Sequence, residues 1–493
     1  MLSNVFRRIF SFPAMLLTGL LVSPFFASLD VQQGGTVIRD PDIWWHLHNA
    51  GLLLSTLQFP VKDVFSFTAH SQPWINPEWL AEIPYYLGFR LLGERGIFLV
   101  MLSAVELLIA GVFFLCYRRS GDVKAAFLAT WVGVLLATIN IGPRTILFGW
   151  LCFIGELLLL EAFRRGEDRI WLLVPLFALW VNLHGSWLIG FIFLLLFIAS
   201  GQLEGTWGSI VAVRWTSKQR QKLIGVAVAA VAAVFFNPYG WRLVVYPFDL
   251  FFRQQFSLAM ADEWGSVDFQ SFYGELIFLV IAAMLILTLA RRRAWPLHEL
   301  LFALFAFYAG LTHKHFLFLI GIVVCPMLAI ELEGAVFAPY DAKRNKPLLS
   351  AAIMAAYLVF ALDHIPTSAE LRTAEARYLP VRALPALQAD CANRRVLNSY
   401  EWGGYLTMNA PGTPVFTNSS AGIFEYHGLL ADDLNVLSLN DSLRTLDQNG
   451  IGCALLSPNY QLVYLLRNTP GWQVGYGDST ATLLVRASET SSR

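Results

Sequence analysis

A series of apolar runs, separated by clusters of Lys and Arg, constrains this chain more than any other feature. A hydrocarbon core of about 30 Å needs about 20 apolar residues per helix. Hydrophobic residues make up 56% of the 493 positions and charged residues only 14%, too apolar a composition for an ordinary soluble globule. The sequence therefore predicts a polytopic α-helical membrane protein with about eleven transmembrane helices, over residues 9–29, 96–117, 125–140, 145–163, 170–183, 186–201, 223–236, 270–290, 298–312, 316–331 and 347–363.

Basic residues occupy every second connection between these runs, which predicts the orientation by the positive-inside rule. The N-terminus is then cytoplasmic, and an odd number of spans places the C-terminus outside. The first run follows Arg7 and Arg8 and is long, so we expect a retained signal anchor rather than a cleaved signal peptide. The other basic clusters are Arg118 to Lys124, Arg164 to Arg169, Arg214 to Lys222, Arg291 to Arg293 and Lys343 to Lys346.

The composition changes near residue 366, after which the chain contains Arg but no Lys and has short runs of strand length. We expect a transmembrane domain over residues 1–365 and a small extracytoplasmic α/β domain over 366–493. None of the five cysteines has metal-ligand spacing. Cys391 and Cys453 share the C-terminal domain and can pair there, but we expect two free thiols.

The first outer loop, residues 30–95, is rich in aromatic side chains, and we expect it to contain interfacial helices. It begins with Asp40-Pro41-Asp42, two carboxylates that can hold a divalent cation, accept a proton from a hydroxyl, or merely cap the next helix. Trp44 and Trp45 can stack on a sugar or anchor the loop at the headgroups, and His46 follows them.

Four further polar features lie on the same predicted face. Glu78 is an acidic residue in the first turn of a predicted helix, where a negative charge is favourable. Arg144 follows a Gly-Pro turn, where it can bind a lipid phosphate or only snorkel. Asn182 and His184 break an apolar run, so they either face a cavity or link helices by hydrogen bonds. The turn His313-Lys314-His315 offers up to three cationic donors to a phosphate or diphosphate. Metal binding by the two histidines is the less favoured alternative, because no third ligand lies nearby in the sequence.

Five motifs carry a resemblance to a large group of mostly uncharacterised bacterial multi-spanning membrane proteins. They are Asp40 to Leu47, Pro73 to Glu82, Trp180 to Gly185, Asn237 to Gly240 and Trp402 to Leu406. That group looks like part of the GT-C superfamily of glycosyltransferases, with the protein O-mannosyltransferases, the aminoarabinose transferase of lipid A and the oligosaccharyltransferases. The resemblance implies transfer of a sugar from a polyprenyl-phosphate carrier outside the membrane, usually with inversion.

The resemblance also implies that an acid early in the first outer loop acts as the base or ligates a metal such as Mg or Mn. Here that acid is Asp40 or Asp42, and the similarity of the following helices slightly favours Asp40. The expected substrate contacts are Trp44, Trp45, His46, Glu78, Arg144, Asn182, His184, His313, Lys314 and His315, with the cations on the phosphate side. The chain departs from the group at 417–422, where relatives tend to carry an acidic-Gly-Arg motif, and at Lys314, where they tend to have Arg.

The resulting hypothesis is a glycosyltransferase of the bacterial inner membrane, with its C-terminal domain periplasmic or extracellular. It moves a sugar from a polyprenyl-phosphate-linked donor to a lipid, glycan or protein acceptor. Membrane lipids surround it, and zero net charge gives no indication of a nucleic-acid partner. A lipid or solute transporter should show repeated halves, which the sequence lacks. A non-catalytic scaffold on a similar bundle is the other alternative. Only the enzyme requires the first-loop acids, His184 and the 313–315 turn to converge.

Overall fold

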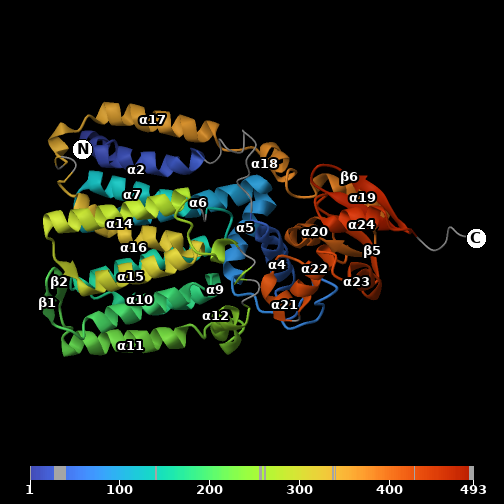
Figure 1. Cartoon of the computed structure of the whole chain (residues 1–493). Coiled ribbons are helices and arrows are strands. Elements are labelled where there is room, and N and C mark those ends of the chain that lie inside the picture. Colours follow the sequence, from blue (N-terminus) through green and yellow to red (C-terminus); the bar gives the residue numbers. More distant parts are fainter. Residues whose placement is uncertain are drawn as a thin grey trace, which may run out of the picture.

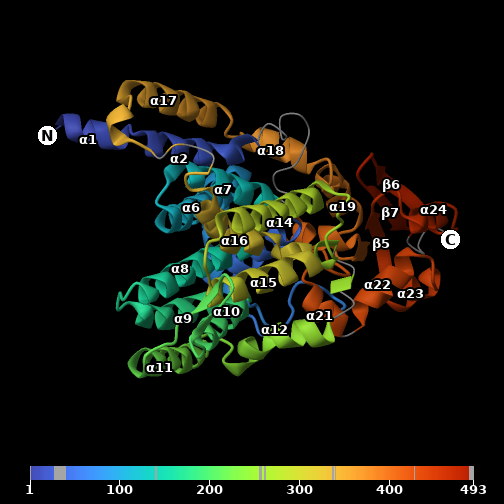
Figure 2. The same cartoon turned by 60° about the vertical axis from the view of Figure 1, so that its left-hand side comes forward.

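The computed structural model describes residues 2–26, 40–138, 141–254, 258–259, 262–335, 338, 340–426 and 428–487. The end of the predicted signal anchor and the start of the first outer loop, together residues 27–39, lie outside this part, as do 139 and 140 of a predicted span. Long helices lie side by side in one bundle, and a smaller region with a sheet covers one end of it, as two views show (Figure 1, Figure 2).

Every predicted apolar run coincides with a helix. These helices are α2 (Phe12–Val22), α6 (Glu94–Ser120), α7 (Val123–Ala137), α8 (Ile146–Arg164), α9 (Leu173–Leu183, after η3, Ile170–Leu172), α10 (Trp187–Ser200), α11 (Ser217–Ala233), α14 (Phe272–Arg291), α15 (Leu297–Thr312), α16 (Leu317–Leu332) and α17 (Pro347–Asp363). Within the described residues, four helices are long and apolar enough to cross a membrane, or five if the bent pair of α17 and α18 (Ser368–Glu375) is one span. The chain is a membrane protein, but the count of eleven spans is not confirmed.

The connection between α6 and α7 shows how the sequence ends one helix and begins the next. Gly121 adopts a left-handed conformation with φ 69°, which only glycine takes without strain. Asp122 then caps α7 by accepting hydrogen bonds from the backbone N–H groups of Lys124 (2.8 Å) and Ala125 (3.3 Å).

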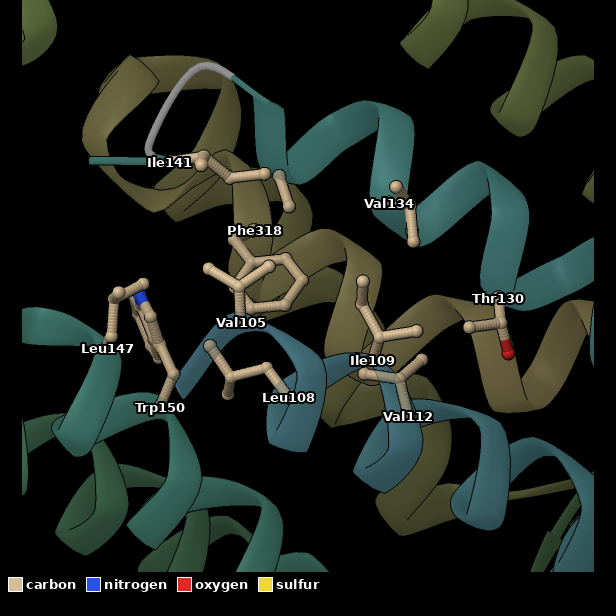
Figure 3. A pocket seen from close by; sticks show the side chains of 12 residues that line it. Val105, Leu108, Ile109, Val112, Thr130, Val134, Ile141, Leu147, Trp150 and Phe318 are labelled. Atoms are coloured by element: carbon tan, nitrogen blue, oxygen red, sulfur yellow. The ribbon is translucent and has the colours of Figure 1, made fainter. Parts of the chain in front are cut away.

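Close backbone approach holds the centre of the bundle together. A Cβ on Gly321 of α16 would lie 3.2 Å from the Cα of Gly133 of α7, so the two glycines let these helices pack at short range. A gap of about 20 Å³ remains between α6, α7, α8 and α16, lined by side chains such as Trp150 and Phe318 (Figure 3). The gap is apolar and near the size of one water, so it is a packing gap rather than a substrate site.

The first outer loop lies between the bundle and the C-terminal region. It contains α4 (Asp42–Thr56) and α5 (Trp79–Leu92). The predicted extended segment at 63–68 pairs across domains, because Ser66 forms a parallel bridge with Val415 and the Phe67 N–H donates to the Val415 carbonyl at 3.1 Å.

The C-terminal region contains a four-stranded sheet of order β4-β5-β7-β6. Strand β4 (Arg395–Asn398) runs parallel to β5 (Ile451–Leu456), while β7 (Thr482–Arg486) is antiparallel to β5 and to β6 (Trp472–Gly477). Val415 lies outside the strands and forms isolated bridges with Ser66 and Val396. A second small sheet, β1 (Gly205–Trp207), β2 (Ile210–Ala212) and β3 (Trp295–Pro296), lies at the opposite end of the bundle (Figure 1).

Cys391 and Cys453 form a disulfide, so the expectation of two free thiols is wrong. The fold places Cys391 after α19 (Leu384–Asp390), beside β5, with 6.2 Å between the two Cα atoms. Sequence spacing does not reveal this proximity. Such bonds persist in oxidising compartments, which agrees with the predicted extracytoplasmic side.

Removing the disulfide should loosen the C-terminal region. The bond closes a loop with a sequence separation of 62, and a loop of this length stabilises by about 4 kcal/mol in the chain-entropy account. Amide hydrogen exchange of β4 and β5 in the full chain should therefore be faster in Cys391→Ser than in the wild type. A reducing agent should reproduce the effect in the wild type and leave the variant unchanged. Equal exchange in all samples would contradict the prediction.

Candidate functional site

Asp40 has two structural partners at the start of α4. Its Oδ1 accepts a hydrogen bond from the backbone N–H of Asp42, the first residue of α4, at 3.0 Å. Its Oδ2 forms an ion pair with Nε of Arg144, and the Asp40 side chain is 8% exposed. The N-cap of α4 is Pro41, so Asp40 binds the start of the helix from the residue before the cap, and Arg144 neutralises its carboxylate.

Arg144 connects Asp40 to the other predicted cation site. Its Nη1 pairs with Oε2 of Glu263, and the other oxygen of Glu263 lies 3.1 Å from Nδ1 of His315. Burial would raise the pKa of Glu263, but His315 and Arg144 lower it to about 2. Four segments far apart in the sequence thus meet in a row of alternating charge.

Asp42 has no direct ion-pair partner in the described part of the chain, but the charge of His46 acts on it. Burial and the charge of Asp40 raise its pKa to about 7, while His46 and the polar side chains of Ser419 and Trp45 oppose the rise. Ser419 belongs to the segment that departs from the pattern of the resembling proteins. The C-terminal region therefore brings a hydroxyl, rather than an acidic-Gly-Arg motif, close to this carboxylate.

His46 lies in a buried network behind the two acids. Its Nδ1 is 2.8 Å from Oε1 of Glu82, whose other oxygen accepts hydrogen bonds from Asn49 (2.5 Å) and Asn76 (2.9 Å). Burial would lower the pKa of His46, but the hydrogen bond and charge of Glu82, with the charges of Glu78 and Asp42, raise it to about 9. His46 is therefore a fixed cation near Asp42 at neutral pH.

Glu78 joins His46 to His184. Its two oxygens lie 3.5 Å from Nε2 of His46 and 3.3 Å from Nε2 of His184, and the Thr145 hydroxyl donates to it at 2.8 Å. Burial raises the pKa of Glu78, an effect that His46 opposes. Burial and the neighbouring charges of His315 and His46 lower the pKa of His184 to about 3, so this imidazole is neutral.

Two predicted substrate contacts, Asn182 and Lys314, are bound by other residues of the fold. The Asn182 amide accepts a hydrogen bond from Trp79 Nε1 at 2.9 Å and donates to the carbonyls of Ala178 (2.8 Å) and Phe236 (3.0 Å). It therefore links separate parts of the fold by hydrogen bonds. Lys314 pairs with Asp262 at 2.7 Å.

His313 forms no ion pair with the row of charges among the described residues, and its ring lies edge-on to that of Trp264. Its Nδ1 lies 2.9 Å from the Thr312 hydroxyl, and only His315 of this turn reaches Glu263. His315 also stacks on Trp264, with ring centroids 5.1 Å apart and an interplanar angle of 11°.

The tryptophan pair is buried, contrary to the expectation that both rings shape a sugar pocket. Trp44 is 2% exposed and packs edge-on against Phe89 and Tyr405. Trp45 is 8% exposed, and its ring lies 3.7 Å from that of His46. Trp44 has no ring face left for a sugar, because the C-terminal region covers it.

The motif Trp402 to Leu406 seats the C-terminal region on α4. A Cβ on Gly404 would lie 3.0 Å from the backbone nitrogen of Trp45, and one on Gly403 would collide with the carbonyl oxygen of Thr417. Both positions therefore require glycine for close backbone approach. The motif holds the 417–419 segment beside the acids of the first outer loop.

The predicted metal site does not fit this arrangement. The described residues include no group of three His, Cys, Asp or Glu side chains able to hold a metal ion. The guanidinium of Arg144 already lies against both Asp40 and Glu263. A divalent cation would have to displace it, so we derive no step through a metal.

The overall fold is similar to those of two solved proteins, ArnT and an oligosaccharyltransferase. The chain is similar to the structure of ArnT from Cupriavidus metallidurans bound to undecaprenyl phosphate, with a TM-score of 0.57, 15% identity, and coverage of 96% of this chain and 98% of that one. The structure of ArnT in the apo state gives a TM-score of 0.56 at 15% identity, covering 95% and 97%.

The chain is also similar to the Archaeoglobus fulgidus oligosaccharyltransferase tethered with an acceptor peptide. The TM-score is 0.54 at 13% identity, with coverage of 89% of this chain and 68% of that one. No protein-family model and no curated protein sequence matches the chain. At these identities the likeness establishes the fold, and the activity has to be argued from the site.

Proposed function

We propose that the protein is a glycosyltransferase that moves a sugar from a polyprenyl-phosphate-linked donor to an acceptor at the outer face of the bacterial inner membrane. The observation that carries the proposal is that a carboxylate able to accept a proton and a guanidinium able to bind a phosphate lie at the same site. Asp42, which has no direct ion-pair partner among the described residues, lies beside Asp40, which holds the Arg144 guanidinium in place. The GT-C fold and the undecaprenyl phosphate bound to ArnT support this choice of reaction.

In the proposed step, ionised Asp42 accepts the proton of the acceptor hydroxyl as that oxygen bonds to the anomeric carbon. The bond from the anomeric carbon to the phosphate oxygen breaks, and the electron pair leaves with the polyprenyl phosphate. Arg144, supported by Glu263 and His315, stabilises the charge on the leaving phosphate. His46 keeps part of the Asp42 population ionised, since its positive charge opposes the effects of burial and Asp40.

The test compares polyprenyl-linked sugars and surface glycans in cells that lack the protein and in the same cells complemented with wild type or Asp42→Asn. Loss of the protein and Asp42→Asn should both cause a lipid-linked sugar to accumulate and a glycan modification to disappear. Identical profiles in all strains, at normal protein levels, would favour the non-catalytic scaffold.

The pH dependence separates Asp42 from Asp40 as the base. With the pKa of Asp42 at about 7, the transfer rate should rise about tenfold per pH unit below pH 7 and level off above it. Asp40→Asn removes a negative neighbour that raises the pKa of Asp42, so the rising limb should move to lower pH. Initial rates in membranes, measured from about pH 5 to 9, check this. An unshifted limb in Asp40→Asn would contradict the coupling.

A further inference from the structure

A groove on the membrane domain lies at the end opposite the C-terminal region. It runs between α6, α8 and the η3–α9 segment and has a volume of about 500 Å³. Asp168, just before η3, pairs with Lys222 near the start of α11, which places this segment at the end of the bundle that carries β1 and β2 (Figure 1). The groove is therefore far from the row of charges at Asp40 and Arg144.

Most of the groove wall is apolar and open to the outside of the bundle. Phe114 and Leu179 are 45% and 47% exposed, and Leu158 and Leu176 complete the surface between them. The stretch of α8 from Gly155 to Ala162 covers roughly 10 Å of helix, compared with about 15 Å for the hydrocarbon of one leaflet. The shape suits an acyl chain.

The end of the groove carries an excess of positive charge. Arg118 and Arg169 share one carboxylate, Glu167, at 3.4 Å and 3.7 Å, so the three groups together keep one positive charge. Each guanidinium has five N–H donors, most of which remain for another acceptor. Arg118 also lies over the ring of Phe114, 5.5 Å from its centroid, where the polar end meets the apolar wall.

We propose that the groove binds one anionic diacyl phospholipid of the adjacent leaflet. The phosphate is held by Arg118 and Arg169, and one acyl chain lies along the groove. Charge complementarity selects the anionic headgroup, because a zwitterionic lipid brings an ammonium toward two arginines. Trp171, 57% exposed, lies next to this end, as expected for a side chain at the boundary between membrane and water.

Native mass spectrometry of the full chain in detergent tests the site with phosphatidylglycerol and phosphatidylcholine of equal acyl length. The wild type should bind phosphatidylglycerol about tenfold more tightly, which is the scale of one charge-assisted hydrogen bond. Arg118→Gln with Arg169→Gln should remove this preference, and Glu167→Gln should increase it. Arg344→Gln is the matched control, since Arg344 is an exposed arginine paired with Asp341 outside the groove.

A second variant tests the acyl-chain part without changing charge. A Cβ on Gly155 would lie 3.8 Å from the Leu176 side chain, an ordinary contact, so Gly155→Phe can extend into the groove. Gly155→Phe should weaken the binding of both lipids. Unchanged lipid binding in Gly155→Phe would overturn the acyl-chain placement. Equal affinity of the wild type for the two lipids, or an unchanged preference in the double arginine variant, would overturn the proposal.

Discussion

Asp42→Asn is expected to lower the rate of sugar transfer by about 10²- to 10⁴-fold, the range typical of removing a general base. The substitution keeps the size of the side chain and its neighbours Trp45 and Ser419, but removes the group that accepts the proton. A pulse-chase measurement of the polyprenyl-linked sugar in membranes gives the rate. Asp268→Asn is the matched control, because Asp268 is an exposed acid that caps a local turn through Gln270.

The comparison with Asp40→Asn decides which acid is the base. Asp40→Asn should lose less activity, because the Asp40 carboxylate binds the first N–H of α4 and pairs with Arg144 rather than remaining free for a proton. The reverse order, with Asp40→Asn inactive and Asp42→Asn near wild type, would assign the base to Asp40. Full activity in both variants would exclude either acid as the base.

The apolar runs predicted the helices well, because length and hydrophobicity are local properties of the chain. The residues that surround Asp40 and Asp42 cannot be predicted from local sequence in the same way. Glu263 meets Arg144 from 119 residues away, and nothing in the sequence around it indicates that contact. Ser419 was visible only as a departure from a motif, and nothing local brings it to Asp42.

The tryptophan pair shows a second limit of sequence reasoning. Adjacent Trp44 and Trp45 fit a sugar platform, an interfacial anchor or a buried contact equally well by composition. The glycines of the 402–406 motif decide between them, because they let the C-terminal region approach α4 closely enough to cover Trp44. Which rings are buried depends on this long-range packing, as does the Cys391–Cys453 disulfide.

Arg144→Gln should have the other large effect, a loss of about 10²- to 10³-fold in transfer rate, as for removal of a preorganised charge-stabilising group. The variant leaves Asp40 and Glu263 without their shared cation, and loss of the partner of the buried Asp40 carboxylate destabilises the fold. Arg144→Lys should recover only part of the activity, since a lysine cannot reach two carboxylates with a planar fork.

A double variant separates the catalytic loss from the structural one. Asp40→Asn combined with Arg144→Gln removes the carboxylate that would otherwise remain buried and unpaired, while Glu263 keeps His315 as its partner. Thermal unfolding of the full chain in detergent should therefore show the double variant to be more stable than Arg144→Gln alone, whereas its transfer rate should stay low. If the rate returned together with the stability, Arg144 would only support the fold, and the leaving phosphate would need a different cation.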